Sequence, residues 1–270
     1  MTPIVAAVQM TSGPDVSANI AVADRWLRAA AEAGACVAVL PENFAFMGLR
    51  DGDKIKVAEN EGRGFVQDSI AKLAASLGLW IIAGTLPVRI EDERRVAAAS
   101  LVFDADGKQV ARYDKIHLFD VDVPGRDESH RESTYISAGD RVVTVDTPAG
   151  RVGLSVCYDV RFPELYRRMA AEGAQWLVVP AAFTVPTGRA HWELLLRARA
   201  VENLAFVVAS GQSGVHLSGR QTYGDSMIVD HWGEVLGRLP QGEGIVTARF
   251  DLDAQRRVRE TFPALSHRRF

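Results

Sequence analysis

The sequence predicts a single α/β domain over residues 1–270, built as a four-layer α-β-β-α sandwich around two mixed sheets. Short β-rich runs alternate with amphipathic helical patterns along the chain. Two hairpin signals add antiparallel strands, which a purely parallel fold lacks. Segments such as WIIAGTL and WLVVP are apolar on both faces, so they need cover on both sides.

The first third of the chain alternates strands with helices. We expect strands at residues 4–9, 36–40 and 80–88, and helices at residues 17–33 and 64–77. Ser17 or Asp15 can cap the first helix at its start, and Gly34 can end it.

The rest of the chain adds hairpins to this pattern. Asp106 and Gly107 lie between two alternating runs and predict the first hairpin, and residues 147–150 predict a second that leads into VGLSVC. Further along we expect a strand at 175–180, a helix at 190–203 and a strand at 204–210. The end of the chain predicts a meander with turns at 231–233 and 240–244.

Composition and charge exclude several classes of partner. A net charge of -3 with acids and bases interspersed gives no basic stripe, so we expect no nucleic-acid partner. No apolar run is long enough for a signal peptide or a membrane span, so we expect a cytoplasmic protein with no membrane contact. Two cysteines are too few for a disulfide framework, and both are expected as thiols. No linker or composition shift divides the 270 residues.

Three polar residues stand where apolar strands are expected to stop: Glu42 after CVAVLP, Lys115 after VARYD and Cys157 after VGLSV. The carboxyl ends of strands are where α/β folds assemble their sites. Each residue alone is ambiguous. An acid there can cap a helix, a lysine can be solvated, and a cysteine can be a small core residue.

Other kinds of site fit the sequence less well. GLSVC has a cysteine where the G-x-S-x-G elbow needs glycine, which disfavours Ser155 as a nucleophile. A cysteine–histidine pair with His117 has no orienting partner at a recognisable spacing. No metal-ligand spacing, P-loop or G-x-G-x-x-G occurs, so we expect neither a metal nor a cofactor. Cys36, inside ACVAVL, is interpreted as a buried structural thiol.

Several longer segments carry a resemblance to a known family. They are AAVQM, LPENF, YDKIHLFDVDVPG, ESTYISAGD, GLSVCYDVRFPEL, AFTVPTGRAHWELLLRARAVEN and YGDSMIVDHWGEVL. Together they cover nearly the whole chain, which resembles the nitrilase, or carbon-nitrogen hydrolase, superfamily. The resemblance implies a Glu-Lys-Cys triad at Glu42, Lys115 and Cys157, with a second glutamate at Glu132.

Within that superfamily the chain is most similar to the Nit amidases, of which two subgroups compete. One hydrolyses deaminated glutathione, and the other is an ω-amidase acting on 2-oxoglutaramate and 2-oxosuccinamate. PAAFT, GQSGVH, RQTYG and SHRRF look more like the first, although Ala181 replaces the serine common in that subgroup. The family also implies a homodimer formed by helix packing near ARARAVEN.

The mechanism implied by the resemblance is amide hydrolysis through a thioester with release of ammonia. Cys157 attacks, Glu42 serves as base and acid, and Lys115 stabilises the oxyanion together with the backbone N–H of Tyr158. Glu132 orients Lys115 or the substrate amide.

A substrate that carries carboxylates invites a guanidinium, and Arg161, Arg189 and Arg220 lie in segments expected near the pocket. Phe183 and Thr184 of AFTVPTG are further candidates for substrate contact. Nitrile hydrolysis, N-carbamoyl hydrolysis, acyl transfer and a catalytically silent binding protein of the same fold are the alternatives.

Overall fold

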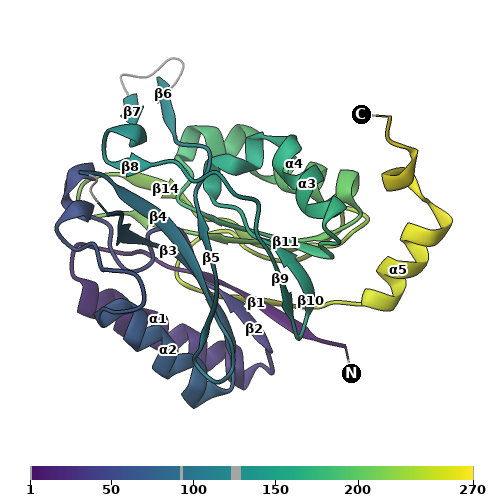
Figure 1. Cartoon of the computed structure of the whole chain (residues 1–270), viewed down its shortest axis with the longest axis horizontal. Helices are drawn as coiled ribbons and strands as arrows, with labels where there is room; N and C mark the ends of the chain where they lie inside the picture. Colours follow the sequence, from purple (N-terminus) through teal and green to yellow (C-terminus); the bar gives the residue numbers. More distant parts are fainter. Residues whose placement is uncertain (1, 92–93, 123–128, 270) are drawn as a thin grey trace.

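The computed structural model describes residues 2–91, 94–122 and 129–269, and it confirms the predicted four-layer sandwich. Two sheets lie face to face in the middle of the molecule (Figure 1). Helices α1 (Val16–Glu32) and α2 (Phe65–Leu77) cover the outer face of one sheet. Helices α3 (Pro163–Ala171) and α4 (Val185–Asn203) cover the outer face of the other. None of the helices in these described ranges is long and apolar enough to cross a membrane.

The first sheet has the order β17-β1-β2-β3-β4-β5, with β8 beside β4. Its strands β1, β2 and β3 run parallel, while β17 pairs antiparallel with β1, β4 with β3, and β5 with β4. They span Ile4–Gln9 (β1), Val37–Val39 (β2), Trp80–Arg89 (β3), Val96–Phe103 (β4), Gln109–Asp114 (β5), Ile136–Ser137 (β8) and Gly244–Arg249 (β17).

The second sheet has the order β16-β15-β12-β11-β10-β9 and is also mixed. Strands β10, β11 and β12 are parallel, and the outer strands are antiparallel. They span Thr144–Thr147 (β9), Gly150–Gly153 (β10), Trp176–Ala181 (β11), Phe206–Gly211 (β12), Ser226–Val229 (β15) and Val235–Leu239 (β16). Both predicted hairpins are present, as β4–β5 and β9–β10.

Shorter elements complete the chain. Two small ribbons pair β6 (Asp120–Asp122) with β7 (Ser129–Arg131) and β13 (Ser213–Val215) with β14 (Gln221–Tyr223). The closing helix is α5 (Leu252–Thr261). The 3-10 turns are η1 (Asp51–Ile55), η2 (Glu132–Thr134), η3 (Cys157–Arg161) and η4 (Ala264–His267).

Strand β1 shows how the layers are packed. Successive side chains of a strand point to opposite faces, and here both faces are buried. Val5 and Ala7 belong to the core between the sheets, whereas Ala6 and Val8 belong to the core beneath α1 and α2. Segments that are apolar on both faces are therefore covered on both sides, as their sequences predict.

Two helix boundaries refine the sequence-based expectations. Asp15, rather than Ser17, caps α1, because its carboxylate accepts the N–H of Ala18 at 3.0 Å. Helix α4 begins at Val185 instead of residue 190. Pro186 fits the first turn of a helix, where its missing N–H costs no hydrogen bond, so it opens α4 rather than delaying it.

The predicted closing meander is wrong in its last step. Strands β15 and β16 form a hairpin in the second sheet, but β17 crosses over and pairs antiparallel with β1 in the first sheet. A glycine- and proline-rich turn predicts a change of direction without specifying the strand that receives the next segment. Strand β17 thus ties the end of the chain to its beginning.

Candidate active site

The structure brings Glu42, Lys115, Glu132 and Cys157 together at one edge of the sandwich. Glu42 follows β2 and Lys115 follows β5, so both come from the first sheet. Cys157 opens η3 after β10 of the second sheet, and Glu132 opens η2. The site therefore lies where the ends of strands from two sheets meet.

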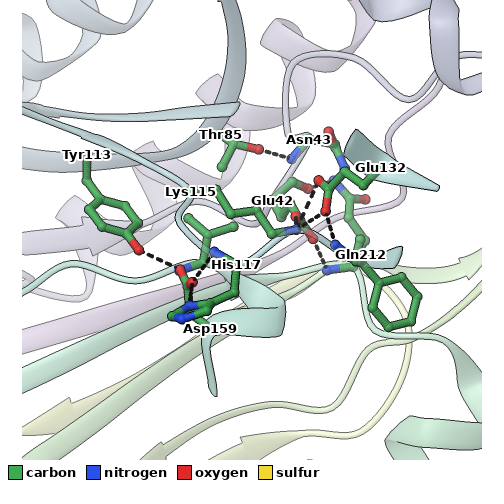
Figure 2. Close-up of polar contacts among 12 residues, drawn as sticks. Glu42, Asn43, Thr85, Tyr113, Lys115, His117, Glu132, Asp159 and Gln212 are labelled. Carbon is green, nitrogen blue, oxygen red and sulfur yellow. Dashed lines mark hydrogen bonds and ion pairs between the residues drawn. The ribbon is translucent and has the colours of Figure 1, made fainter. Parts of the chain in front are cut away.

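Lys115 lies at the centre of this cluster, and only 2% of its surface is exposed. Its Nζ lies 2.8 Å from Glu42 Oε1 and 3.0 and 2.8 Å from the two carboxylate oxygens of Glu132 (Figure 2). Burial opposes the charge on Lys115, but the carboxylates of Glu132 and Glu42 outweigh it and raise the pKa of Lys115 well above its ordinary value. Lys115 is thus a fixed ammonium group.

Glu42 links the two halves of the site. Its Oε1 accepts from Lys115, and its Oε2 accepts the backbone N–H of Ala182 at 2.8 Å, just past the end of β11 in the second sheet. The main chain around it is also held, because Gln212 donates to the carbonyl of Glu42 at 3.1 Å. Only 4% of Glu42 is exposed.

Glu132 is held in place from two sides. Besides Lys115, its Oε2 accepts the backbone N–H of Phe119 at 2.7 Å. Burial is the largest single influence and raises the pKa of Glu132. The charges of Lys115 and Lys54 and the hydrogen bonds from Lys115 and the Phe119 N–H together outweigh it, so the net pKa lies below the ordinary value. The neighbouring Arg131 pairs with exposed Asp122 instead.

Cys157 has an unusual backbone conformation, with φ at 49° in the left-handed region. Such a conformation costs a non-glycine residue about 1 kcal/mol and needs support from its surroundings. The expected strand into Cys157 ends early, at Gly153, and the chain then turns sharply into η3. Burial first, and then the Glu42 carboxylate, raise the pKa of the Cys157 thiol well above its ordinary value, while Lys115 opposes them.

Asp159 supports this turn and is completely buried. Its Oδ2 accepts the backbone N–H of Val156 at 2.8 Å and the phenol of Tyr113 at 2.7 Å. Its Oδ1 accepts the backbone N–H of His117 at 3.0 Å and lies 2.7 Å from the Nδ1 of the same residue (Figure 2). Asp159 therefore anchors the segments that carry Cys157 and Lys115 to each other.

The alternatives weighed from the sequence are placed elsewhere. Ser155 is buried, and its Oγ donates to the Val178 carbonyl and contacts the Tyr166 hydroxyl, both at 2.6 Å. Cys36 is half-buried rather than buried, because it precedes β2 at the end of the sheet, and its Sγ lies 3.4 Å from the Ile4 carbonyl. In the described part of the chain, no three His, Cys, Asp or Glu side chains are grouped so as to hold a metal ion.

A cleft opens beside the cluster. It is lined by Glu42, Asn43, Asp51, Lys54, Lys115, Phe119, His130, Arg131, Glu132, Tyr135, Cys157, Tyr158, Ala182, Phe183, Thr184, Thr187 and Arg220. Of the residues expected to contact substrate, Phe183, Thr184 and Arg220 line the cleft. Arg189 lines a neighbouring groove, and Arg161 lies outside both, over the rings of Tyr158 and Phe183.

The sequence did not indicate nine of the lining residues: Asn43, Asp51, Lys54, Phe119, His130, Arg131, Tyr135, Ala182 and Thr187. Asn43 directly follows Glu42 and Thr187 lies in AFTVPTG, so proximity to the motifs could have indicated both. Asp51 and Lys54 lie in a short 3-10 turn that no motif marks. The last three residues of HLFDVDVPG, one of the segments behind the resemblance, lie outside the described residues.

Comparisons with known proteins identify the family of this chain. The carbon-nitrogen hydrolase family profile matches residues 4–260. The human protein named deaminated glutathione amidase is 40% identical over 270 residues, which cover 99% of this chain and 82% of that protein.

Two solved structures carry the comparison further. Nit3 of Saccharomyces cerevisiae, described as a member of branch 10 of the nitrilase superfamily, matches with a TM-score of 0.89 at 31% identity, over 100% of this chain and 97% of that one. An amidase mutant from Nesterenkonia sp. AN1, in which acrylamide has added to the active-site cysteine, matches with a TM-score of 0.80 at 26% identity, over 97% and 98% of the two chains. This chain therefore belongs to the carbon-nitrogen hydrolase family of the nitrilase superfamily.

Proposed function

We propose that this protein is a cysteine-dependent amidase that hydrolyses deaminated glutathione through a thioester on Cys157. The observation that carries the proposal is the buried Lys115 ammonium, which pairs with Glu42 beside a thiol that lines a cleft. The 40% identity to a protein named for this substrate supports the choice of amide.

The first step forms a bond between the Cys157 sulfur and the amide carbon. Because the pKa of the thiol is raised, the resting group is neutral and must lose its proton during attack. Glu42 takes that proton as general base. The carbonyl electron pair moves to oxygen, where the Lys115 ammonium and the Tyr158 backbone N–H stabilise the negative charge. Tyr158 lies in the first turn of η3, where N–H groups have no partner within the helix.

The second step breaks the carbon–nitrogen bond. Glu42 returns its proton to the departing nitrogen, and a thioester remains on Cys157. The nature of the leaving group corrects one expectation from the sequence. Ammonia leaves only from a primary amide such as 2-oxoglutaramate, whereas in deaminated glutathione the amide nitrogen belongs to cysteinylglycine, so an amine leaves.

The last step releases the acid. Glu42 removes a proton from water, which adds to the thioester at the same oxyanion position. Collapse breaks the carbon–sulfur bond, and the proton held by Glu42 returns to the sulfur. The products are 2-oxoglutarate and cysteinylglycine, with the Cys157 thiol restored.

Glu132 positions Lys115 rather than touching the substrate amide. It contacts the ammonium with both carboxylate oxygens and is itself fixed by the Phe119 N–H. Without Glu132, Lys115 would be held by Glu42 alone, and the donor aimed at the oxyanion would lose one of its two anchors.

Arg220 is the arginine we assign to the carboxylate of the 2-oxo acid, since it is the one of the three candidates that lines the cleft. Its Nε is buried and has no hydrogen-bond partner among the described residues, which leaves a donor for a ligand. Phe183 and Thr184, which follow the end of β11, would contact the acyl chain of the substrate.

We further propose that the protein is a cytoplasmic homodimer and that residues 1–270 fold as one domain. Leu194 and Val201 are 69% and 49% exposed and lie seven residues apart on α4, which places them on the same face. Such an apolar helix face suits packing against its symmetry-related copy.

The test is a panel of substrates assayed with purified protein: deaminated glutathione, 2-oxoglutaramate, a nitrile and an N-carbamoyl amino acid. The proposal expects the highest kcat/KM with deaminated glutathione, equimolar 2-oxoglutarate and cysteinylglycine, and an acyl-enzyme mass on Cys157 after rapid quenching. Cys157→Ala should abolish both signals, and Cys36→Ala should keep them. Turnover of the nitrile alone, or none of the four, would reject the proposal.

A further inference from the structure

The cleft at Cys157 is continuous with a larger groove. The groove is lined by Asn43, Phe46, Met47, Gly48, Leu49, Arg50, Asp51, Lys54, Ser129, His130, Val185, Pro186, Arg189, Ser218, Gly219, Arg220 and Gln221. Five residues line both hollows: Asn43, Asp51, Lys54, His130 and Arg220. A molecule held at Cys157 can therefore extend into the groove.

The two hollows differ strongly in size. The cavity volume is about 50 Å³ in the cleft and about 620 Å³ in the groove. A slender acyl chain suits the cleft, whereas the cysteinylglycine part of deaminated glutathione needs more room. This reasoning rests on the proposed function, because it assumes the tripeptide-derived amide as substrate.

The groove has a basic lining. Among the described lining residues, Arg50, Lys54, Arg189 and Arg220 oppose the single carboxylate of Asp51. The Nη2 of Arg50 lies 3.9 Å from the Oδ1 of Asp53, so Arg50 has a carboxylate partner outside the groove lining. An anionic ligand is favoured by the excess of positive charge at such a concave surface.

Lys54 stands at the junction between the two hollows, half-buried in η1. None of the ion pairs or hydrogen bonds shown among residues 2–91, 94–122 and 129–269 engages its ammonium group. Its field reaches the active site, because it contributes to lowering the pKa of Glu132. A half-buried cation that makes no direct ion pair with the described residues is available for an anion of the substrate.

Chain length agrees with this position. Two residues in extended conformation reach at most about 7 Å from the scissile nitrogen to the terminal carboxylate. A ligand of that length bound at Cys157 meets the residues that line the cleft before those that line the groove alone. Lys54, which lines both, is therefore better placed than Arg189, which lines only the groove.

We propose that the groove is the leaving-group subsite and that Lys54 binds the terminal carboxylate of the departing dipeptide, with Arg189 adding to the field further out. Lys54 then selects amides whose leaving group ends in a carboxylate over primary amides. It acts on the choice of substrate and takes no part in bond making.

Three substrates test this assignment: deaminated glutathione, its C-terminal carboxamide and 2-oxoglutaramate, which has no dipeptide. Wild-type protein should show a KM about 10-fold higher for the carboxamide than for the free acid. In Lys54→Met the KM for the free acid should rise about 10-fold to meet that of the carboxamide, and this rise should exceed any change in the KM for 2-oxoglutaramate. Lys56→Met is the matched control, since Lys56 lies two residues away, is exposed and pairs with Asp53.

Inhibition by cysteinylglycine gives a second readout. Its inhibition constant should weaken about 10-fold in Lys54→Met and stay constant in Lys56→Met. Persistence of the acid-over-carboxamide preference in Lys54→Met, or an equal change with 2-oxoglutaramate, would overturn the assignment while leaving the proposed function intact. Failure of the proposed function is a different result, namely no turnover of the tripeptide amide by wild-type protein.

Discussion

Lys115 and Glu132 are joined by a two-point contact, with Nζ 3.0 and 2.8 Å from the two carboxylate oxygens. We expect Glu132→Gln to lower kcat by about 10²-fold with little change in KM, because Lys115 keeps its charge but loses an anchor. Steady-state kinetics with thermal unfolding as a check on folding would measure this. Glu61→Gln, which removes an exposed acid paired with Arg112, is the control. Wild-type kcat in Glu132→Gln would contradict the positioning role.

The pH dependence of Cys157 alkylation should respond in opposite directions to its two charged neighbours. The Glu42 carboxylate raises the pKa of the thiol, and Lys115 lowers it. Glu42→Gln removes a negative charge next to the thiolate, so the rate profile with iodoacetamide should shift to lower pH. Lys115→Met should shift it to higher pH. A Cys36→Ala background isolates Cys157, and shifts in the same direction would refute the assigned electrostatics.

Asp159 should matter for both stability and rate. In Asp159→Asn the new amide group would face donors that now point at a carboxylate, including the Val156 N–H and the Tyr113 hydroxyl. We expect a loss of about 2–4 kcal/mol in the free energy of unfolding and a 10- to 100-fold lower kcat, since the turn at Cys157 would relax. Tyr113→Phe removes one donor and should cost only about 1 kcal/mol. Denaturant titration and kinetics would measure both, and equal effects of the two variants would argue against the anchoring role.

The three candidate arginines should separate in their effects on KM. Arg220→Met is expected to raise KM about 10- to 100-fold for both deaminated glutathione and 2-oxoglutaramate, because both carry the 2-oxo acid carboxylate. Arg189→Met should affect only the tripeptide amide. Arg161→Met should have the smallest effect, since Arg161 lies outside the cleft and contacts His191. If Arg161→Met gave the largest increase in KM, the substrate carboxylate would be assigned to Arg161, which lies over the ring of Phe183.

The exposed face of α4 should carry the dimer. Light scattering is expected to give twice the mass of one chain for the wild type and a single-chain mass for Leu194→Asp or Val201→Asp, because a buried unpaired carboxylate is costly. Leu217→Asp places the same change at another exposed leucine and should leave the dimer intact. A single-chain mass for wild-type protein would exclude the dimer.

The positions of Glu42, Lys115 and Cys157 could be predicted because strand ends in an α/β sandwich converge at one edge, and the motifs around them are specific. Lys54 could not be found in this way. It lies in a 3-10 turn with no motif, and its proposed role depends on its position between the cleft and the groove, which only the three-dimensional structure shows.

Contacts between residues far apart in the chain could not be predicted from the sequence either. Asp159 lies two residues from Arg161 in the sequence, but it pairs with Tyr113, 46 residues away. Periodicity identified β17 as a strand, yet it did not show that β17 joins the first sheet beside β1. Local sequence predicts the kind of element, whereas pairing depends on tertiary packing.

The hydrogen bond from the Ala182 N–H to Glu42 joins the edge of one sheet to the edge of the other. The proposed acid–base group and ammonium thus belong to one layer, while the nucleophile belongs to the next. A small shift of one sheet relative to the other would separate the reacting groups, even if both sheets stayed folded. The reactivity of the Cys157 thiol therefore reports on how tightly the two sheets pack against each other. Mutations that loosen the core between the sheets should slow turnover before they lower solubility.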